Sequence, residues 1–172
     1  MGDELRGENL VHLNVRFSTE PELKKIQDFL YEKSGQGVSF TGLVEAMANE
    51  VTIVTAVHNI KSNKGRRTAG VDKIKMENYL QMPNAELSLL IQSSFRNYRP
   101  KPARREYIEK SNGKKRPLGI PTVLDRIIQE CVRIIIEPIC EARFYPQSYG
   151  FRPYRAQKHA IRGIMNVIHA GC

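Results

Sequence analysis

One stretch decides how this chain of 172 residues folds. It runs Arg104-Arg105-Glu106-Tyr107-Ile108-Glu109-Lys110, Ser111-Asn112-Gly113, Lys114-Lys115-Arg116-Pro117-Leu118-Gly119-Ile120-Pro121. Charged and apolar residues alternate on both sides of the Asn-Gly pair, and this arrangement is the strongest short-range signal for a β-hairpin. We therefore predict two antiparallel strands joined by a tight turn.

The predicted hairpin carries cations that suit a triphosphate. Arg104 and Lys110 fall on one face of their strand, because side chains alternate along a strand with a period of two. Arg offers a planar fork of donors and Lys a mobile point charge, and both bind anionic oxygens. Whether Arg116 joins them depends on how the two strands pair.

The register of the hairpin has two alternatives. A two-residue Asn112-Gly113 loop would pair Glu109 with Arg116 and put Lys110 opposite Lys115. A three-residue loop or a bulge would instead set Lys110 opposite Arg116. The sequence alone leaves both registers open.

Positive charge is concentrated around this hairpin. The net charge of the chain is +9, and the segment from Arg96 to Arg116 holds nine Lys and Arg residues against Glu106 and Glu109. A solvated charge run is the plain interpretation of such a segment. The alternation with Tyr, Ile, Leu and Pro holds the charges on a rigid scaffold, which favours a surface that binds nucleic acid.

The composition predicts a soluble, intracellular protein, and the location that we expect for it is the cytoplasm of a bacterial cell. Hydrophobic residues make up 41% of the chain, enough for a buried core. No apolar run approaches the roughly 20 residues that span a bilayer, so we expect no membrane contact. Cys131, Cys140 and Cys172 lack the spacing of zinc ligands, so we expect buried free thiols and no metal site.

Most of the remaining sequence reads as helix, which predicts an α+β fold with a mostly helical body and a small antiparallel sheet. Thr19 and Glu22 fit a capping box with Pro21 in the first turn. Pro138 is expected to bend or interrupt the most apolar helix. The predicted elements are a strand within 10–17 and helices from Thr19, from Thr41 or Gly42 to Ala48, from Asn49, over 73–82, over 85–97 after an Asn84 cap, from Thr122 to Ile136 or beyond, and from Arg155 to His169. On the last helix the residues predicted to face inward are Ile161, Ile164, Met165 and Ile168.

A basic loop, residues 61–72, precedes the hairpin. Gly65 and Gly70 superficially suggest a phosphate-binding loop, but the P-loop pattern needs Lys after its second Gly, where this chain has Val71. The pattern therefore excludes an NTPase of that kind. A loop that wraps a phosphate backbone and a merely mobile loop both remain open.

Four motifs together resemble the fingers of reverse transcriptases of the group II intron type. They are Thr68-Ala69-Gly70-Val71-Asp72, the hairpin, Leu118-Gly119-Ile120-Pro121 and Tyr149-Gly150-Phe151-Arg152-Pro153. Each motif is weak alone, but their combined spacing across roughly residues 19–172 is specific. The resemblance implies the fingers subdomain of a right-hand polymerase, with residues 1–62 as extra N-terminal helices and residues 63–172 as the fingers proper, in one compact piece.

The resemblance implies roles for residues of the hairpin. Lys110 and Arg116, with Arg104 as a weaker match, correspond to contacts with the triphosphate of an incoming nucleotide. The residues that correspond to the contact with the templating base are Leu118, Gly119, Ile120 and Pro121. Core packing is an equal alternative for Leu118 and Ile120.

Other residues are implied to contact RNA. Gly150, Phe151 and Arg152 are expected near the template strand, with Arg152 as the stronger contact and a core anchor as the alternative for Phe151. The N-terminal region of the family helps to bind intron RNA, so its basic residues are candidate contacts to the phosphate backbone. These are Lys24, Lys25, Lys61, Lys64, Arg66 and Arg67, and a solvated surface charge is the alternative for each.

The chemistry of such enzymes needs clustered carboxylates that hold two Mg2+ ions. The chain has only Asp3, Asp28, Asp72 and Asp125, without an Ala-Asp-Asp signature, and helix capping explains Asp125. We therefore expect an excised piece with no catalytic residue and no cofactor of its own, unable to polymerise alone. Two Mg2+ ions are expected only in the full-length enzyme.

Three functions remain in competition. The first is the fingers of an RNA-directed DNA polymerase that also acts as an intron splicing factor, a maturase. Its partners would be intron RNA and template RNA, with a DNA primer and dNTP in the full-length enzyme. The second is a non-catalytic RNA-binding splicing module. The third is a basic helical domain of a DNA-binding regulator, for which we find no convincing helix-turn-helix.

An exposed apolar patch left by a missing palm makes a homodimer a further hypothesis.

Overall fold

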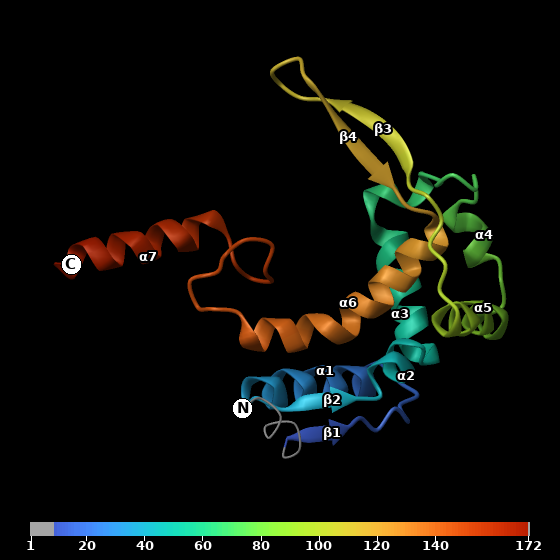
Figure 1. Ribbon diagram of the computed structural model, residues 1–172, viewed down its shortest axis with the longest axis horizontal. Coiled ribbons are helices and arrows are strands. Elements are labelled where there is room, and N and C mark those ends of the chain that lie inside the picture. Colours follow the sequence, from blue (N-terminus) through green and yellow to red (C-terminus); the bar gives the residue numbers. More distant parts are fainter. Residues whose placement is uncertain (1–8, 172) are drawn as a thin grey trace, which may run out of the picture.

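The computed structural model describes residues 9–171, and most of its elements are helices (Figure 1). The first half contains β1 (Leu10–His12), α1 (Glu20–Gly35), β2 (Ser39–Thr41), α2 (Leu43–Met47), α3 (Glu50–Ser62) and the 3-10 helix η1 (Lys64–Arg67). The second half contains α4 (Met76–Leu80), α5 (Asn84–Arg96), β3 (Arg104–Glu109), β4 (Lys115–Ile120), α6 (Val123–Arg143) and α7 (Gln157–His169). The predicted α+β class and the predicted hairpin are confirmed.

The structure has a second small sheet that the sequence analysis missed. β1 and β2 pair in parallel, with Leu10 opposite Ser39 and His12 opposite Thr41. The strand predicted within residues 10–17 is therefore shorter than expected. It ends at His12, whose ring Nδ1 lies 3.0 Å from the hydroxyl of Thr41. The pairing partner lies 29 residues away, so no local pattern signals it.

The core is built around α6, which lies along both α1 and α3 (Figure 1). This helix extends without interruption from Val123 to Arg143. Its apolar residues lie on more than one side, so several neighbouring elements bury them. The buried residues that it contributes are Val123, Ile127, Ile128, Cys131, Ile134 and Ile135. They pack with buried residues of the other helices, among them Leu23, Leu30, Ile53, Ile60 and Ile91.

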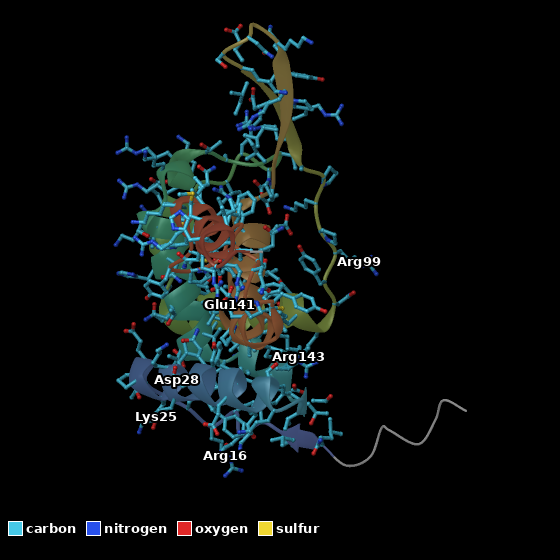
Figure 2. The ribbon with its side chains drawn as sticks, turned by 90° about the vertical axis from the view of Figure 1, so that its left-hand side faces the viewer. Arg16, Lys25, Asp28, Arg99, Glu141 and Arg143 are labelled. Atoms are coloured by element: carbon cyan, nitrogen blue, oxygen red, sulfur yellow. The ribbon has the colours of Figure 1, made fainter. Side chains whose placement is uncertain are left out.

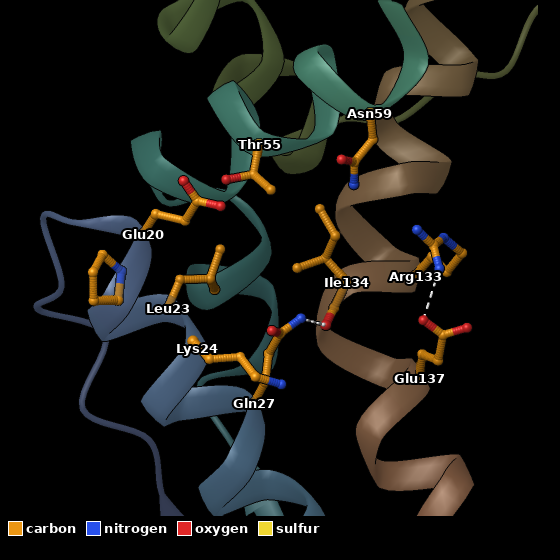
Figure 3. Close-up of a pocket in the computed structure, with 10 residues that line it drawn as sticks. Glu20, Leu23, Lys24, Gln27, Thr55, Asn59, Arg133, Ile134 and Glu137 are labelled. Carbon is orange, nitrogen blue, oxygen red and sulfur yellow. Dashed lines mark hydrogen bonds and ion pairs between the residues drawn. The ribbon is translucent and has the colours of Figure 1, made fainter. Parts of the chain in front are cut away.

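Pro138 was expected to bend or interrupt α6, and it lies inside the helix without interrupting it. A proline has no backbone N–H, which leaves the carbonyl four residues earlier without its helical donor. That carbonyl belongs to Ile134, and the side-chain Nε2 of Gln27 on α1 donates to it at 3.0 Å. A side chain from the neighbouring helix thus replaces the missing backbone bond, as the dashed line in Figure 3 shows.

The C-terminal end of α6 is joined to the first half of the chain by polar contacts. The hydroxyl of Ser34 donates to the carbonyl of Ile139 at 2.9 Å. Arg143 donates to the hydroxyl of Ser34 and to the carbonyl of Val38, both at 2.9 Å. These bonds span more than 100 residues of sequence and fix α1 and β2 to the end of the long helix.

The cysteines are free thiols where the structure describes them. Cys131 is fully buried, and burial raises the pKa of its thiol to about 12. A thiol with such a pKa stays protonated at neutral pH, so this residue is a core side chain and not a nucleophile. Cys140 is only partly buried, and Cys172 lies outside the described residues.

Two of the predicted helix starts are confirmed and one is shifted. The carboxylate of Glu22 accepts the N–H of Thr19 at 3.1 Å, as a capping box requires, and the N–H of Ser18 lowers its pKa. Asn49 caps α3 through the N–H of Val51 at 2.8 Å. The cap of α5 is Pro83, so Asn84 is the first helical residue instead of the cap.

The prediction that α7 turns an apolar face inward is wrong. The helix forms where it was expected, but Ile161, Ile164, Met165 and Ile168 are 47% to 61% exposed. Figure 1 shows the reason, since α7 extends away from the helical body and no other helix of the described chain lies along it. The periodic pattern predicted the helix correctly but could not supply a partner for it.

Two further findings bear on the expected organisation. No helix within residues 9–171 combines the length and the apolar character that a membrane crossing requires.

Buried residues from both sides of the proposed boundary at residues 62 and 63 share one core, because α6 packs against α1 and α3. The division into 1–62 and 63–172 stays a prediction.

We predict that Gly70→Ala destabilises the fold. A Cβ at Gly70 would lie 2.6 Å from the Cα of Thr122 and 2.8 Å from its nitrogen, and neither backbone atom can move cheaply. Overpacking of this kind lowers the free energy of unfolding by about 1–3 kcal/mol. Urea denaturation measures the change. Gly35→Ala is the matched control, because nothing lies within 4 Å of the added methyl, and equal stability of the two variants would contradict the prediction.

Candidate nucleic-acid interface

The hairpin has the three-residue loop of the second alternative, but with a pairing that neither alternative gave. Its strands pair Arg104 with Ile120 and Glu109 with Lys115, and the ladder continues through a bond from the N–H of Lys110 to the carbonyl of Lys114 at 2.7 Å. The loop has three residues and closes with Gly113 at φ +73°, a conformation that favours glycine. A three-residue loop therefore sets Lys110 opposite Lys114.

Arg116 accordingly lies opposite Ile108, and the expected pairings with Glu109 or Lys110 do not occur. Residues that pair across an antiparallel ladder point to the same side, and alternate residues along each strand share that side. Lys110, Arg116 and Arg104 therefore lie on one face of the hairpin. Arg104 and Lys110 were predicted to share one face, and the observed register places Arg116 on that face as well.

This face, the basic face, consists of Arg104, Glu106, Ile108, Lys110, Lys114, Arg116, Leu118 and Ile120. It carries four cations and one carboxylate, a net charge of +3, whereas the opposite face carries Arg105, Lys115 and Glu109, a net charge of +1. Within the described residues no ion pair involves Lys110, Lys114 or Arg116. Their charges are therefore available to an anion from outside the protein.

The hairpin stands clear of the helical body (Figures 1 and 2). All its residues except Arg104 and Ile120, at its base, are exposed. Leu118 is 39% exposed, so it is not packed in the core, which was the alternative for this residue. Ile120 is partly buried. Gly119 falls on the opposite face from Leu118, and Pro121 follows the end of β4.

Arg104 joins the base of the hairpin to the basic loop. Its Nε donates to the carbonyl of Ala69 at 3.1 Å, and its Nη1 lies 2.6 Å from Oε1 of Glu106. Two of its donors are thus already used inside the protein. Lys110 and Arg116 differ from it in this respect.

The basic loop is fixed from below by α6. Arg126 donates through Nη1 to the carbonyl of Gly65 at 3.0 Å and through Nη2 to the carbonyl of Thr68. Burial lowers the pKa of the Arg126 guanidinium, which the charge of Asp72 opposes. Two arginines therefore hold the loop, one from the hairpin and one from the helix, while its own cations point outward. The exposed cations are Lys61, Lys64, Arg66 and Arg67. The segment predicted as a loop is partly helical, because Lys61 lies in α3 and the other three lie in η1.

Arg126 was not among the predicted site residues, although its position in the first turn of a helix is a sign in the sequence that it needs a partner. A cation in the first turn of a helix is opposed by the positive end of the helix dipole, so it needs a specific partner. Asp125, its neighbour, is not the cap itself but the third residue of α6, and the cap is Thr122. The backbone N–H of Asp125 donates to the hydroxyl of Thr122 at 3.1 Å, and that hydroxyl donates to the Asp125 carboxylate at 2.6 Å. The hydroxyl of Tyr98 also donates to this carboxylate at 3.0 Å.

The described residues do not fit the two Mg2+ ions that a polymerase site would hold. No group of three or more His, Cys, Asp or Glu side chains in residues 9–171 is arranged to bind a metal ion. The carboxylate of Asp125 is buried and used by Thr122 and Tyr98. That of Asp72 lies 3.6 Å from the Lys101 ammonium and accepts the N–H of Ile74. Both carboxylates therefore have structural partners.

The candidate residues of α1 lie far from the hairpin, at the opposite end of the molecule (Figure 1). Lys24 forms an exposed ion pair with Asp28 at 3.2 Å and lines a pocket of about 460 Å3 between α1, α3 and α6 (Figure 3). Lys25 is exposed on the outer side of α1 (Figure 2). The structure thus separates the predicted RNA contacts into two regions.

The 149–153 motif reverses the expected exposure of its two main residues. Phe151 is 111% exposed and is not a core anchor, whereas Arg152 is 9% exposed. The guanidinium of Arg152 donates to both carboxylate oxygens of Glu141 and to the carbonyls of Tyr145 and Ser148. Its charge is therefore compensated inside the protein, so this geometry favours a structural role over the predicted RNA contact. Gly150 is exposed with open space around it.

Several known proteins with similar sequences carry names that refer to introns. LtrA, a group II intron-encoded protein of Lactococcus lactis, is 41% identical over 127 residues, which cover 73% of this chain and 21% of LtrA. A 91 kDa protein in the cob intron of Schizosaccharomyces pombe is 33% identical over 161 residues, 88% of this chain and 20% of that protein. This chain belongs to the group II intron-encoded protein family.

The expected family resemblance is thus confirmed. A further family relative by sequence is protein YkfC of Escherichia coli, 47% identical over 104 residues, 60% of this chain and 27% of YkfC. No protein-family model matches the chain. The chain spans between 20% and 27% of the length of these three relatives.

We predict that Arg126→Met loosens the basic loop without unfolding the helix below it. Methionine keeps the length and the helix propensity but removes the donors to Gly65 and Thr68. Amide hydrogen exchange across residues 64–69 should speed up at least tenfold, while exchange within α6 stays slow. Arg133→Met is the control, because Arg133 pairs only with carboxylates of its own helix. Equal exchange in the two variants would show that Arg126 does not hold the loop.

Proposed function

We propose that this chain is the fingers region of an RNA-directed DNA polymerase of the group II intron type, which also acts as a maturase, and that it binds intron and template RNA. One observation carries the proposal. The basic face presents Lys110, Lys114 and Arg116 without internal ion pairs, on a hairpin that stands clear of the body. Cations held on a rigid projecting ribbon can track a phosphate backbone.

The names of several relatives support the maturase part. They include a maturase-like protein of Euglena gracilis, 26% identical over 106 residues, and a mitochondrial nuclear intron maturase of Arabidopsis thaliana, 46% identical over 44 residues. By this proposal the basic loop, with Lys61, Lys64, Arg66 and Arg67, binds the phosphate backbone of the intron. Lys24 and Lys25 on α1 form a separate contact with the same RNA.

The proposal includes a contact with the incoming dNTP. Lys110 and Arg116 share the basic face with Arg104, so that an anionic triphosphate lying on that face meets a mobile ammonium and a planar guanidinium. Arg104 contributes mainly by fixing the base of the hairpin, because its Nε and Nη1 are used by Ala69 and Glu106. The DNA primer and two Mg2+ ions belong to the full-length enzyme in this proposal.

RNA binding across a salt series tests the proposal. We expect the chain to bind a structured intron RNA more tightly than a scrambled RNA of equal length or duplex DNA. Log affinity should fall with log salt by about 0.7–0.9 for each phosphate neutralised. The double variant Lys110→Gln with Arg116→Gln should reduce this slope by about 1.5, because two contacts are lost.

The control for this variant is Arg16→Gln, which removes an exposed charge at the other end of the molecule (Figure 2). The triple variant of Lys64, Arg66 and Arg67 to Gln should lower both the slope and the preference for the intron. Equal binding of all three nucleic acids with unchanged slopes would refute the proposal. Preference for duplex DNA would instead support a DNA-binding regulator.

We predict that the purified chain does not extend a primer, with or without Mg2+. The carboxylates of Asp72 and Asp125 are used by neighbouring side chains and backbone groups, and no group of three or more His, Cys, Asp or Glu side chains in residues 9–171 is arranged to hold a metal ion. A primer annealed to an RNA template, with labelled dNTP, measures the activity. Any extension by the chain above a heat-denatured control would sink this prediction. A non-catalytic splicing module shares this outcome, and activity of the full-length protein separates the two alternatives.

We also propose that the chain forms a homodimer through α7. Its apolar residues Ile161, Ile164 and Ile168 are about 60% exposed, and burying them against the same helix of a second copy removes this surface from water. Sedimentation velocity should show a mass that rises with concentration. Ile164→Gln with Ile168→Gln should restore the monomer, and a single monomeric species of the unchanged chain at all concentrations would contradict the proposal.

A further inference from the structure

The carboxylate of Asp72, at the end of the basic loop, is nearly buried, with only 8% of the side chain exposed. Its Oδ2 lies 3.6 Å from the ammonium of Lys101, which belongs to the segment that leads into β3. Its Oδ1 accepts the N–H of Ile74 at 3.2 Å. A buried carboxylate is unfavourable without partners, so the position of Asp72 depends on these two contacts.

The charge of Asp72 also acts on two helices. Arg126 of α6 has no ion pair within residues 9–171, and the charge of Asp72 opposes the lowering of its pKa by burial. Burial raises the pKa of the Tyr79 phenol on α4, and the charge of Asp72 raises it further. One carboxylate therefore acts on α4, on α6 and on the segment before the hairpin.

The turn after Asp72 has a conformation that its side chains do not favour by themselves. Lys73 has φ +59°, in the left-handed region, where residues with a long side chain are uncommon. Its N–H donates to the carbonyl of Gly70 at 3.3 Å, and the next N–H, that of Ile74, donates to Asp72. Such a conformation persists where the surrounding contacts impose it. The end of the basic loop is therefore held in one arrangement.

The hairpin contacts the basic loop at both of its ends. At the start of β3, beside the ion pair of Asp72, the Nε of Arg104 donates to the carbonyl of Ala69 at 3.1 Å. After the end of β4, the carbonyl oxygen of Pro121 would lie 3.0 Å from a Cβ on Gly70. The strands themselves stand clear of the body (Figure 1). The direction of the hairpin therefore depends on the position of the loop.

We infer that the basic loop is an effector site for the hairpin, and that Asp72 is the positioning residue that couples the two. RNA bound to the cations of η1 restricts the loop, and the contacts of Asp72 and Ala69 pass this restriction to the base of the hairpin. A triphosphate that binds the ordered hairpin through Lys110 and Arg116 then loses less conformational entropy, so the two ligands bind cooperatively. This inference rests on the proposed function, because it couples two contacts that the proposed function names.

A single indole on the hairpin can measure this coupling, because the chain contains no tryptophan. Tyr107 lies on β3 opposite Pro117, away from the basic face, and is 60% exposed. Time-resolved fluorescence anisotropy of the Tyr107→Trp variant measures how freely the hairpin moves on the nanosecond timescale. Tyr31→Trp is the matched reporter, because Tyr31 is exposed on α1, far from the hairpin (Figure 1).

The first experiment prevents direct binding of RNA to the hairpin. The reporter is placed in a variant in which Lys110, Lys114 and Arg116 are all changed to Gln, and the structured intron RNA is added to saturation. The fast depolarisation of the hairpin indole should fall at least twofold in amplitude, whereas the indole on α1 should not respond. An unchanged amplitude at the hairpin, or loss of all RNA binding in this variant, would overturn the inference.

Variants of the ion pair test whether Asp72 carries the coupling. Asp72→Asn keeps an acceptor for the N–H of Ile74 but removes the charge that faces Lys101, and Lys101→Met removes the partner. Either change should abolish the response of the hairpin to RNA. Lys101→Arg should restore it, which a merely structural role of the lysine stem would not explain. Lys75→Met is the control, because Lys75 is exposed and has no ion pair within the described residues.

The second experiment measures the coupling as an affinity. Inorganic tripolyphosphate is titrated against the Tyr107→Trp variant with the cations of the hairpin intact, and binding is followed at the indole. Saturating RNA should raise the affinity about fivefold, the lower end of typical coupling between two sites. The same titration of the Asp72→Asn variant should show no increase. A lower affinity in the presence of RNA would mean that the two ligands compete for one site, and would overturn the inference.

The outcomes separate this inference from the proposed function. If Lys110→Gln with Arg116→Gln weakens RNA binding as proposed, but RNA changes neither the motion of the hairpin nor its affinity for tripolyphosphate, the coupling is refuted and the proposed function stands. If the unchanged chain binds no RNA, the proposed function itself fails.

Discussion

The basic loop and the hairpin depend on one close contact between two backbone segments. Gly70 lies so near Thr122 that a single added methyl would meet its Cα at 2.6 Å. This contact brings the basic loop against the start of α6, where Thr122 and Asp125 form the helix cap and Arg126 reaches the loop carbonyls. The hairpin enters α6 through the same turn, so its direction follows from that contact. Without it the loop and the hairpin would have no common support.

The basic residues fall into two groups. Some arginines bond to the backbone and hold the basic surface in place, whereas other cations are exposed on that surface. Arg104, Arg126 and Arg152 donate to backbone carbonyls, a task that suits a rigid fork of donors. Lys110 and Arg116 make no internal ion pair in the part of the chain that the structure describes. A count of positive charge cannot separate these classes, because it gives a structural arginine and an available one the same weight. Bonds to carbonyls, visible only in three dimensions, make the distinction.

Local patterns predicted local structure well here, and contacts between distant segments poorly. The Asn-Gly turn, the capping box at Thr19 and the long apolar helix were all predicted, because each depends on neighbours a few residues away. The parallel pairing of β1 with β2 and the partner of Ile134 depend on residues 29 and 107 positions apart, which leave no periodic signal. For the hairpin, a loop of three residues was one of the two alternatives, but such a loop sets Lys110 opposite Lys114, and the expected pairing of Lys110 with Arg116 was wrong. The inverted exposure of Phe151 and Arg152 follows from Glu141, whose position beside the loop no motif records.

The hairpin is exposed on both faces from Arg105 to Gly119. A two-stranded ribbon of this kind is marginal alone, so its stability comes from its ladder and from the attachment at its base. The core therefore places no packing demand on the side chains near its tip. Folding thus constrains the residues at the base of this segment more strongly than those near its tip. The tip of this ribbon can therefore change in sequence while the helices beneath it keep theirs.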